Sequence, residues 1–364
     1  MLGLRKLDWY IMKKFIMTFF IAILLIIGIV IIFDISEKID DFVSREAPLK
    51  AIVFDYYFNF VPYFMNMFSP LFVFITVIFF TSRMTANSEF VAILSCGVSY
   101  HRIMLPYILS AALIALFSLS LNLWVIPRAN VTRVAFEQKY VRDRRNKTDR
   151  DIHYKLEDNC FVYVESFSTW NNTAYNFTLE KIGEDQDHLM SKLSAESAQW
   201  DSVKHVWRLK NYFIREYGEG LRDRIRSGKQ LDTTISLTVE DFYRTRRTVE
   251  QLSRKDLDEL IRTQDERGDA NVMFARIEKN NRLSLPFSAF ILTIIGVSLS
   301  TKKRRGGIGW NIAIGIALSF SYILFMRFSE MFVYTDTLPP GIAIWLPNFI
   351  FAIIAVILYR LAPK

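Results

Sequence analysis

Apolar residues are collected in long runs along this sequence, and most charged residues lie between the runs. A helix needs about 20 apolar residues to cross a hydrocarbon core of about 30 Å. Six runs approach or exceed that length, at about 15–33, 52–81, 105–126, 283–300, 308–332 and 341–361. The pattern therefore predicts six transmembrane helices in two groups of three.

Three of the runs have features that predict how their helices behave. The run at 52–81 is longer than one span needs and contains Pro62 and Pro70, so we expect a tilted or kinked helix. The run at 105–126 is expected to end at Pro127. The run at 15–33 is too long for the core of a secretory signal, and no small-residue cleavage site follows it, so we expect it to remain as a span.

A polar segment of domain size separates the two groups of spans. It opens with helical spacing that would extend the third span, and it closes with two further helical stretches, one expected to start after Ser253 and to end at Gly268. Between them, aromatic and β-branched residues alternate with polar ones, as in strands. These stretches are DIHYKL, CFVYVESF, AYNFTLEKI, VWRLKNYFIREY and DTTISLTV.

The fold class expected from these elements is a polytopic α-helical membrane protein with six transmembrane helices and an inserted antiparallel β-domain. Its parts are 1–127 with helices one to three, 128–281 with the β-domain and its flanking helices, and 282–364 with helices four to six. Basic residues precede the first run, fill the loop between the fourth and fifth, and follow the last. Because short cytoplasmic loops collect Lys and Arg, both termini are expected in the cytoplasm and the β-domain outside it.

Composition excludes several classes of chemistry. The chain is 51% hydrophobic and 23% charged, with a net charge of +8. Cys96 and Cys160 are expected on opposite sides of the membrane, which excludes a disulfide between them, and the four histidines lack the spacing of metal ligands. No phosphate-binding loop or nucleophile motif is present. We therefore expect no catalytic residue, no metal, no cofactor and no nucleic-acid partner. Asn66 and Asn122 are expected to form hydrogen bonds between spans.

The stretch Asn87 to Ser99, between the second and third runs, predicts a short helix. Asn87 can cap its start, Glu89 suits the positive first turn, and Gly97 can end it in a left-handed turn. Four residues share one face, namely Phe90, Ile93, Leu94 and Gly97. Such a helix either lies on the bilayer surface or is gripped by a soluble partner that moves the spans on either side.

One ionisable pair lies in the fifth run. Arg327 is about 28 Å along that helix, near its outer end, and Glu330 follows one turn later. One interpretation is an arginine that reaches for outer head groups beside its acidic partner. The other joins Arg327 and Glu330 with Lys38, at the outer end of the first run, as a rim that binds the phosphates of an anionic lipid.

The order of three spans, an inserted β-domain and three more spans, together with four sequence stretches, resembles the lipopolysaccharide export permeases LptF and LptG. The stretches are LDWYIMKKF, SEFVAILSCGVS, IEKNNRLSLPFSAFILTIIGVSLS and KRRGGIGWNIAIGIALSF. The first of them leans toward the LptG-like branch. The resemblance covers nearly the whole chain and is strongest in the spans.

The resemblance implies an inner-membrane half-transporter. Two such permeases would pair, as a paralogue or a second copy, and a cytoplasmic ABC ATPase dimer would bind the ATP and grip the coupling helices. Glu89 would contact the ATPase, while Phe90 and Leu94 would pack into its groove. Lipopolysaccharide would enter from the outer leaflet, between the first span of one permease and the fifth of the other, near Lys38 and Arg327. It would then pass to the β-domain, a jellyroll in this family, and to a periplasmic bridge protein.

Two other classes of membrane protein are alternatives to this interpretation. A mechanotransmission-type ABC permease for another lipid or lipoprotein would share the external domain but usually has four spans. A membrane receptor or scaffold would need no ATPase, and its short helix should tolerate Glu89→Lys.

Overall fold

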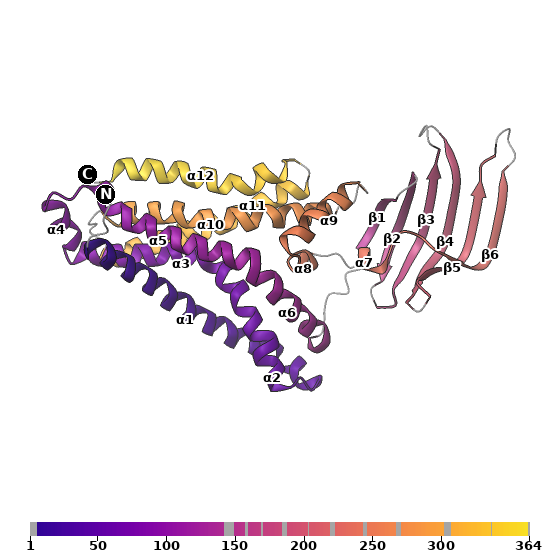
Figure 1. The fold of residues 1–364 in the computed structure, drawn as a ribbon, viewed down its shortest axis with the longest axis horizontal. Helices are drawn as coiled ribbons and strands as arrows, with labels where there is room; N and C mark the ends of the chain where they lie inside the picture. Colours follow the sequence, from indigo (N-terminus) through magenta and orange to yellow (C-terminus); the bar gives the residue numbers. More distant parts are fainter. Residues whose placement is uncertain are drawn as a thin grey trace. The chain divides into compact units, whose positions relative to one another are not determined.

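A computed structural model gives the structure of the chain. It describes residues 6–141, 149–156, 159–168, 170–183, 188–202, 204–218, 223–242, 246–266, 271–301, 307–335 and 337–362. These residues form two compact units (Figure 1). The helical unit comprises 1–141, 250–254 and 276–364, and the β unit comprises 142–249 and 255–275.

The helical unit contains six helices that are long and apolar enough to cross a membrane, within the described residues. Two of these spans are interrupted by short π-helical segments, η1 and η2. In chain order the elements are α1 (Lys6–Ser44), α2 (Leu49–Ala51), η1 (Ile52–Tyr57), α3 (Phe58–Ala86), α4 (Glu89–Ser95), α5 (Tyr100–Ser120), η2 (Leu121–Val125), α6 (Ile126–Tyr140), α10 (Val272–Ser300), α11 (Gly307–Tyr334) and α12 (Pro340–Leu361). The predicted six-span architecture is confirmed.

The sequence predicts that the third span ends at Pro127, but the structure shows that it continues. Helix α5 continues through η2 into α6, and Pro127 lies at the start of α6. Proline lacks a backbone N–H and so removes one helical hydrogen bond. The π-helical turn of η2 lies directly before it, and there the backbone N–H of Ile126 donates to the Leu121 carbonyl. The chain therefore passes the proline without leaving the helix, and the predicted helical extension of this span is confirmed.

Helix α3 lies at the centre of the bundle, with α1, α6 and α11 packed against it. Of the most apolar stretch of α3, 61% of residues are buried, against 22% for α1 and for α11. Two glycines allow neighbouring helices to come close to α3. A Cβ on Gly315 would lie 2.4 Å from Ile78 Cδ1, and one on Gly296 would lie 2.9 Å from Val77 Cγ1. Small residues at such positions permit close backbone approach between spans.

The β unit is built on a six-stranded antiparallel sheet in which each strand pairs with the next along the chain. The strands are β1 (Asp149–Leu156), β2 (Cys160–Ser168), β3 (Thr173–Ile182), β4 (Leu189–Asp201), β5 (Val206–Glu216) and β6 (Arg224–Thr233). One face carries an apolar core that includes Val164, Phe177 and Trp207. Leu237 and Phe242 join this core, and Trp207 Nε1 donates to the Leu237 carbonyl at 2.7 Å.

The predicted β-domain is confirmed, with differences in its strands. Four predicted stretches lie in β1, β2, β3 and β5. No stretch was predicted for β4, and DTTISLTV lies mostly after the end of β6. Only Asp232 and Thr233 of that stretch belong to β6. The predicted helix after Ser253 is α9 (Arg254–Glu266), preceded by the short helices α7 (Val239–Phe242) and α8 (Arg246–Val249). Gly268 and the basic loop at 302–305 lie outside the described residues.

Candidate functional sites

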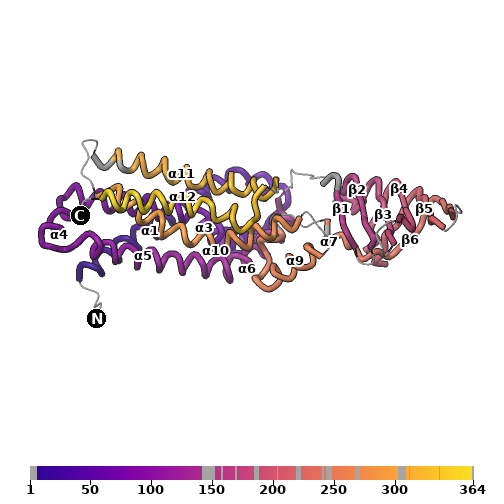
Figure 2. The backbone as a smooth tube through the Cα atoms, turned by 90° about the horizontal axis from the view of Figure 1, so that it is seen from above, coloured from indigo at the N-terminus to yellow at the C-terminus, as the bar shows by residue number. Residues whose placement is uncertain are grey.

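The segment between α3 and α5 carries the short predicted helix, which is α4, at one end of the helical unit (Figure 1 and Figure 2). Helix α4 spans seven residues. Asn87 does not cap it: Asn87 ends α3, and Ser88 precedes α4 in a left-handed conformation with φ of 60°. Gly97 is left-handed with φ of +79°, and its N–H donates to the Leu94 carbonyl. The predicted glycine stop is therefore confirmed, whereas the predicted asparagine cap is wrong.

The predicted apolar face of α4 packs against the protein's own helices. Phe90 is 1% exposed and meets the ring of Tyr100, while Ile93 and Leu94 are partly buried against the same core. In the isolated chain Phe90 is thus covered by the protein's own helices, and its entry into a groove of the ATPase stays a prediction. The opposite face, which includes Val91 and Ser95, is exposed. A partner that grips α4 would meet this second face.

Glu89 lies at the start of α4, beside the end of α1. Its carboxylate accepts a hydrogen bond from Tyr10 Oη at 3.3 Å and one from Asn87 Nδ2 at 3.4 Å. Lys14 donates to the same tyrosine oxygen, one helical turn farther along α1. The side chain of Glu89 is partly exposed. It can therefore meet a partner while it remains attached to α1.

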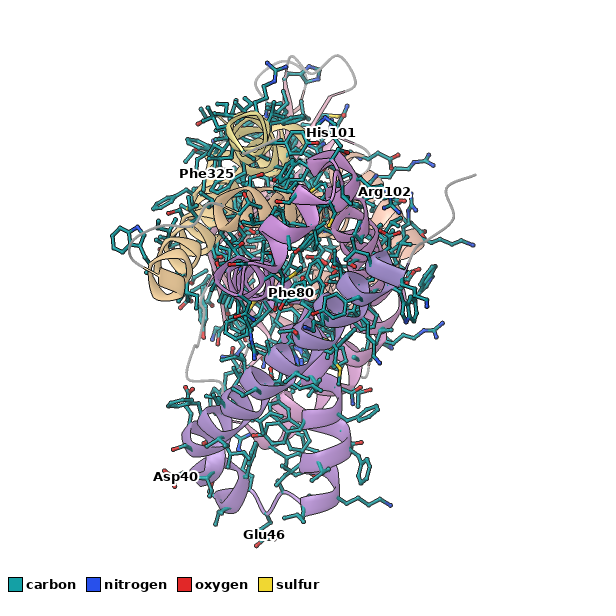
Figure 3. All side chains as sticks on the ribbon, turned by 90° about the vertical axis from the view of Figure 1, so that its left-hand side faces the viewer. Asp40, Glu46, Phe80, His101, Arg102 and Phe325 are labelled. Carbon is teal, nitrogen blue, oxygen red and sulfur yellow. The ribbon has the colours of Figure 1, made fainter. Side chains whose placement is uncertain are left out.

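The residues that flank α4 tie it to three other helices. Arg102 forms a two-pronged ion pair with Asp8 of α1, at 2.7 and 2.5 Å, and Asp8 is 2% exposed. Thr85 donates to the Ser300 carbonyl of α10 at 2.9 Å. His101 contacts Tyr359 of α12 through a hydrogen bond and stacked rings. Figure 3 views the molecule from the α4 end and labels His101 and Arg102.

At the far end of α1, Lys38 is engaged by its own chain. Its Nζ lies 2.7 Å from Asp34 Oδ1 and also donates to Tyr56 Oη. Tyr56 and Tyr57 belong to η1, and both hydroxyls donate to Asp34, at 3.3 and 3.1 Å. The positive charge of Lys38 is thus balanced by Asp34 in this structure. An anionic ligand would have to compete with that carboxylate.

Arg327 and Glu330 form an ion pair on α11. Arg327 Nη1 lies 3.2 Å from Glu330 Oε1, and Asn281 of α10 donates to the same oxygen at 3.1 Å. Glu330 is 5% exposed, whereas the side chain of Arg327 is 48% exposed. Lys38 and Arg327 lie on two helices that both pack on α3, while α1 also packs on α5 and α11 also packs on α12. The lipid-phosphate rim remains a prediction.

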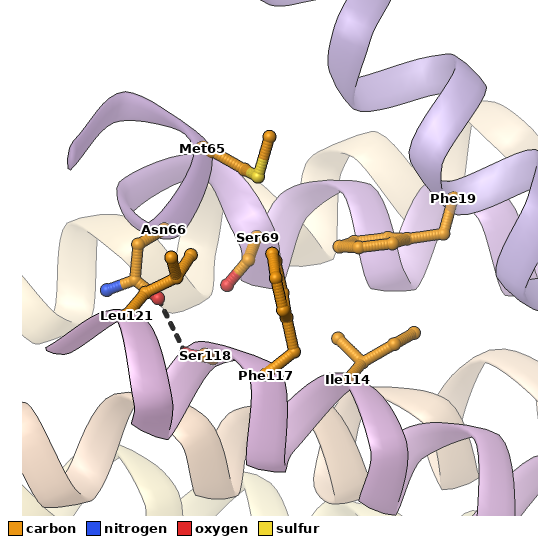
Figure 4. A pocket seen from close by; sticks show the side chains of 8 residues that line it. All are labelled: Phe19, Met65, Asn66, Ser69, Ile114, Phe117, Ser118 and Leu121. Atoms are coloured by element: carbon orange, nitrogen blue, oxygen red, sulfur yellow. Dashed lines mark hydrogen bonds between the residues drawn. The ribbon is translucent and has the colours of Figure 1, made fainter. Parts of the chain in front are cut away.

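Asn66 and Asn348 each belong to a buried hydrogen-bonded cluster in the bundle interior. Asn66 Nδ2 donates to Asn122 Oδ1 at 2.6 Å, which confirms the expected bond between spans, and Ser118 donates to Asn66 Oδ1 (Figure 4). Beside them, a small pocket is lined mainly by apolar side chains of α1, α3 and α5. In the other cluster, Asn348 bonds Ser284 and Tyr322. These polar groups satisfy one another, so they join helices and offer no reactive group to a substrate.

Sequence reasoning missed the residues that hold α4 in place. Asp8 is the single acid within a basic N-terminal stretch, and Arg102 is a cation directly after the loop. Nothing in their spacing shows that they meet, because they are 94 positions apart. A lone acid and a lone cation at the same predicted membrane boundary is the signal that could have suggested the pair.

These features define the class of the protein. It is a multi-pass membrane protein with six candidate spans, a short helix in the loop after the second, and a β-domain inserted after the third. No curated protein sequence gives a significant match to the chain.

Residues 9–361 match the family described as lipopolysaccharide export system permease LptF/LptG, and the chain belongs to that family. The match does not distinguish the LptF branch from the LptG branch. Membership identifies the chain as a permease of a lipopolysaccharide export complex in the inner membrane.

Proposed function

We propose that the chain is one half of the membrane part of an ATP-driven transporter. It extracts lipopolysaccharide from the outer leaflet of the inner membrane and passes it, through the β unit, to a periplasmic bridge protein. ATP is bound and hydrolysed by a separate cytoplasmic ABC ATPase dimer, and a second LptF/LptG-type permease completes the membrane part. The α4 end of the helical unit is then cytoplasmic, together with both chain termini.

The observation that carries this proposal is the construction of α4. Phe90 anchors the helix inward, so its exposed face remains for a partner. The residues around it are tied to α1, α10 and α12 by an ion pair and hydrogen bonds. A displacement of α4 would therefore act on three spans at once. A helix that only rested on the bilayer surface would need no such ties.

The other parts of the molecule fit a lipid substrate. The faces of α1 and α11 that their neighbours do not cover are apolar, with Ile21, Leu25 and Phe328 among the exposed side chains. In the family these two spans, from different permeases, would border the entry path. Lys38 and Arg327 lie at the end of these helices away from α4, where the phosphates of a lipid in the outer leaflet would lie.

Six candidate spans argue against the mechanotransmission-type alternative, which usually has four. The receptor or scaffold alternative is tested by capture of partners. The tagged protein is purified in mild detergent as wild type and as Glu89→Lys, and the retained proteins are identified by mass spectrometry. Glu266→Lys is the matched control, because it reverses an exposed glutamate on α9.

We expect an ABC ATPase with the wild type and the control, and little or none with Glu89→Lys. Recovery of equal amounts from all three samples would show that α4 does not bind the ATPase through Glu89. Absence of an ATPase from the wild type, under conditions that keep the permease pair together, would favour the receptor or scaffold.

A further inference from the structure

Helix α1 packs on the bundle along one side. Its buried apolar side chains recur every fourth residue along one narrow ridge, at Ile11, Phe15, Phe19, Ile23 and Ile27. Contacts of this kind are not directional, so a ridge alone permits sliding or rotation. Only 22% of the most apolar stretch is buried, compared with 61% for α3 and α10. Helix α1 is therefore held more loosely along its length than the central helices are.

Directional contacts hold α1 at its two ends. At the α4 end, Asp8 pairs with Arg102, and Tyr10 donates to Glu89. At the far end, Asp34 accepts hydrogen bonds from Tyr56 and Tyr57 of η1. Arg45, just past the helix, donates to the Lys139 carbonyl of α6 at 3.2 Å. The helix comprises 39 residues, or about 58 Å at the usual rise, so it spans the unit between these two sets of contacts.

The contacts at the α4 end differ in strength. The bond from Tyr10 to Glu89 is exposed and 3.3 Å long, so it is weak. The Asp8 and Arg102 pair is bidentate, charge-assisted and short, and its carboxylate is almost fully buried. Arg102 lies in the first turn of α5, directly after the segment that carries α4. A movement of that segment therefore reaches α1 chiefly through Asp8.

We propose that the Asp8 and Arg102 ion pair transmits movement of α4 to α1, so that α1 acts as a rod that shifts the far-end contacts of Asp34 with η1. Asp8 and Arg102 are positioning residues in this scheme, because they act through α1 and touch neither ATP nor lipid. The segment on which α1 would act is η1, which is π-helical, and π-helical irregularities are common at functional sites. This inference rests on the proposed function, since the driving movement comes from the ATPase.

The test uses the complete complex in proteoliposomes, with this chain, its permease partner and the ATPase. Two rates are measured for each variant: ATP hydrolysis and transfer of lipopolysaccharide to a soluble periplasmic acceptor. The variants are Asp8→Asn, Arg102→Gln and the double replacement. Arg262→Gln with Glu266→Gln removes an exposed ion pair on α9 as the matched control.

We expect the amount of lipid transferred per ATP to fall about five-fold or more in Asp8→Asn and in Arg102→Gln, while ATP hydrolysis continues. Because the two residues act as a unit, the double replacement should be no worse than either single one. The control should match the wild type. A loss of transfer in strict proportion to ATP hydrolysis, or additive losses in the double variant, would overturn the inference.

A second readout follows the rod directly and does not depend on activity. Spin labels on Val43→Cys of α1 and Val131→Cys of α6, both exposed positions, report the distance at the far end. Cys96 and Cys160 are first replaced by serine, because both are free. The distance distribution should change with the nucleotide state in the otherwise native complex and should stop changing in Asp8→Asn. A change of equal size in Asp8→Asn would contradict the role of the pair.

Different results would overturn the proposed transport function and the proposed role of α1. Absence of ATP-driven transfer in the wild type would overturn the proposed function itself. Transfer by the wild type, with an unaltered ratio of lipid to ATP in Asp8→Asn, would overturn only the rod.

Discussion

Phe90 can either anchor α4 to the protein's own bundle or contact the ATPase, and replacement of Phe90 by alanine separates these two roles. Phe90 is 1% exposed and contacts Tyr100 within the core of the helical unit. Truncation of a phenylalanine buried to this degree costs about 3–5 kcal/mol. Helix α4 has only seven residues, and a helix of that length is not stable without tertiary contacts. A loss of about 3 kcal/mol would lower the equilibrium constant for docking of α4 about 100-fold or more.

The assay is amide hydrogen exchange on the purified permease without the ATPase. In Phe90→Ala, the amides of 89–97 should lose protection, whereas those of α3 and α5 should change little. Val91→Ala is the control on the same helix, because Val91 is 51% exposed and holds nothing in place. Its exchange should match the wild type. When the ATPase is added, Phe90→Ala should bind it weakly because α4 is undocked.

The reasoning would be refuted by the opposite pattern. If Phe90→Ala kept full protection at 89–97 but lost the ATPase, Phe90 would contact the partner and would not anchor α4. That result would also restore the interpretation in which the apolar stripe of α4 enters a groove of the ATPase.

Three further predictions concern stability. Gly315→Leu should lower the melting temperature in detergent, because its Cβ would lie 2.4 Å from Ile78 Cδ1; Gly309→Leu, with nothing within 4 Å, should leave it unchanged. Asn66→Leu should destabilise the bundle by about 1 kcal/mol by removing bonds between spans, which denaturant unfolding can measure. Trp207→Phe should cost about 1–3 kcal/mol in a circular dichroism melt of the β signal, since the Leu237 carbonyl loses its buried donor.

The membrane part could be predicted from the sequence because its signal is simple. Length and hydropathy alone locate a span, so all six were found. The ends of the spans depend on more than length and hydropathy. Pro127 predicts the end of the third span, but a π-helical turn before it preserves the helix. Whether a proline ends or only perturbs a helix depends on the neighbouring backbone, which the sequence does not show.

Strand prediction succeeded where side chains carry the usual signal. In strand β2, buried Val162 and Val164 alternate with less buried neighbours, as expected for a half-buried strand. Strand β4 was missed because LMSKLSAESAQWD consists largely of small and polar residues with weak strand preference. Its place in the sheet is fixed by pairing with β3 and β5 on either side. Such non-local pairing cannot be read from the strand itself.

The position of the short helix α4 was predicted from the sequence, but the contacts of its apolar face were not. The helix after the second span and its glycine stop were correct. The apolar stripe was assigned to a partner, although an apolar stripe equally suits the protein's own core. Sequence periodicity identifies a face but not what covers it. The contacts of Asp8 with Arg102 and of Asp34 with Tyr56 depend on the fold and were beyond reach.

Transfer of lipopolysaccharide from proteoliposomes is the measurement that tests the proposed function most directly. Vesicles containing this chain, its permease partner, the ATPase and lipopolysaccharide are given ATP and a soluble periplasmic acceptor, and the lipid bound to the acceptor is measured. We expect transfer that requires ATP and is lost in Glu89→Lys. ATP hydrolysis by the assembled complex without any transfer of lipopolysaccharide would contradict the proposed export function.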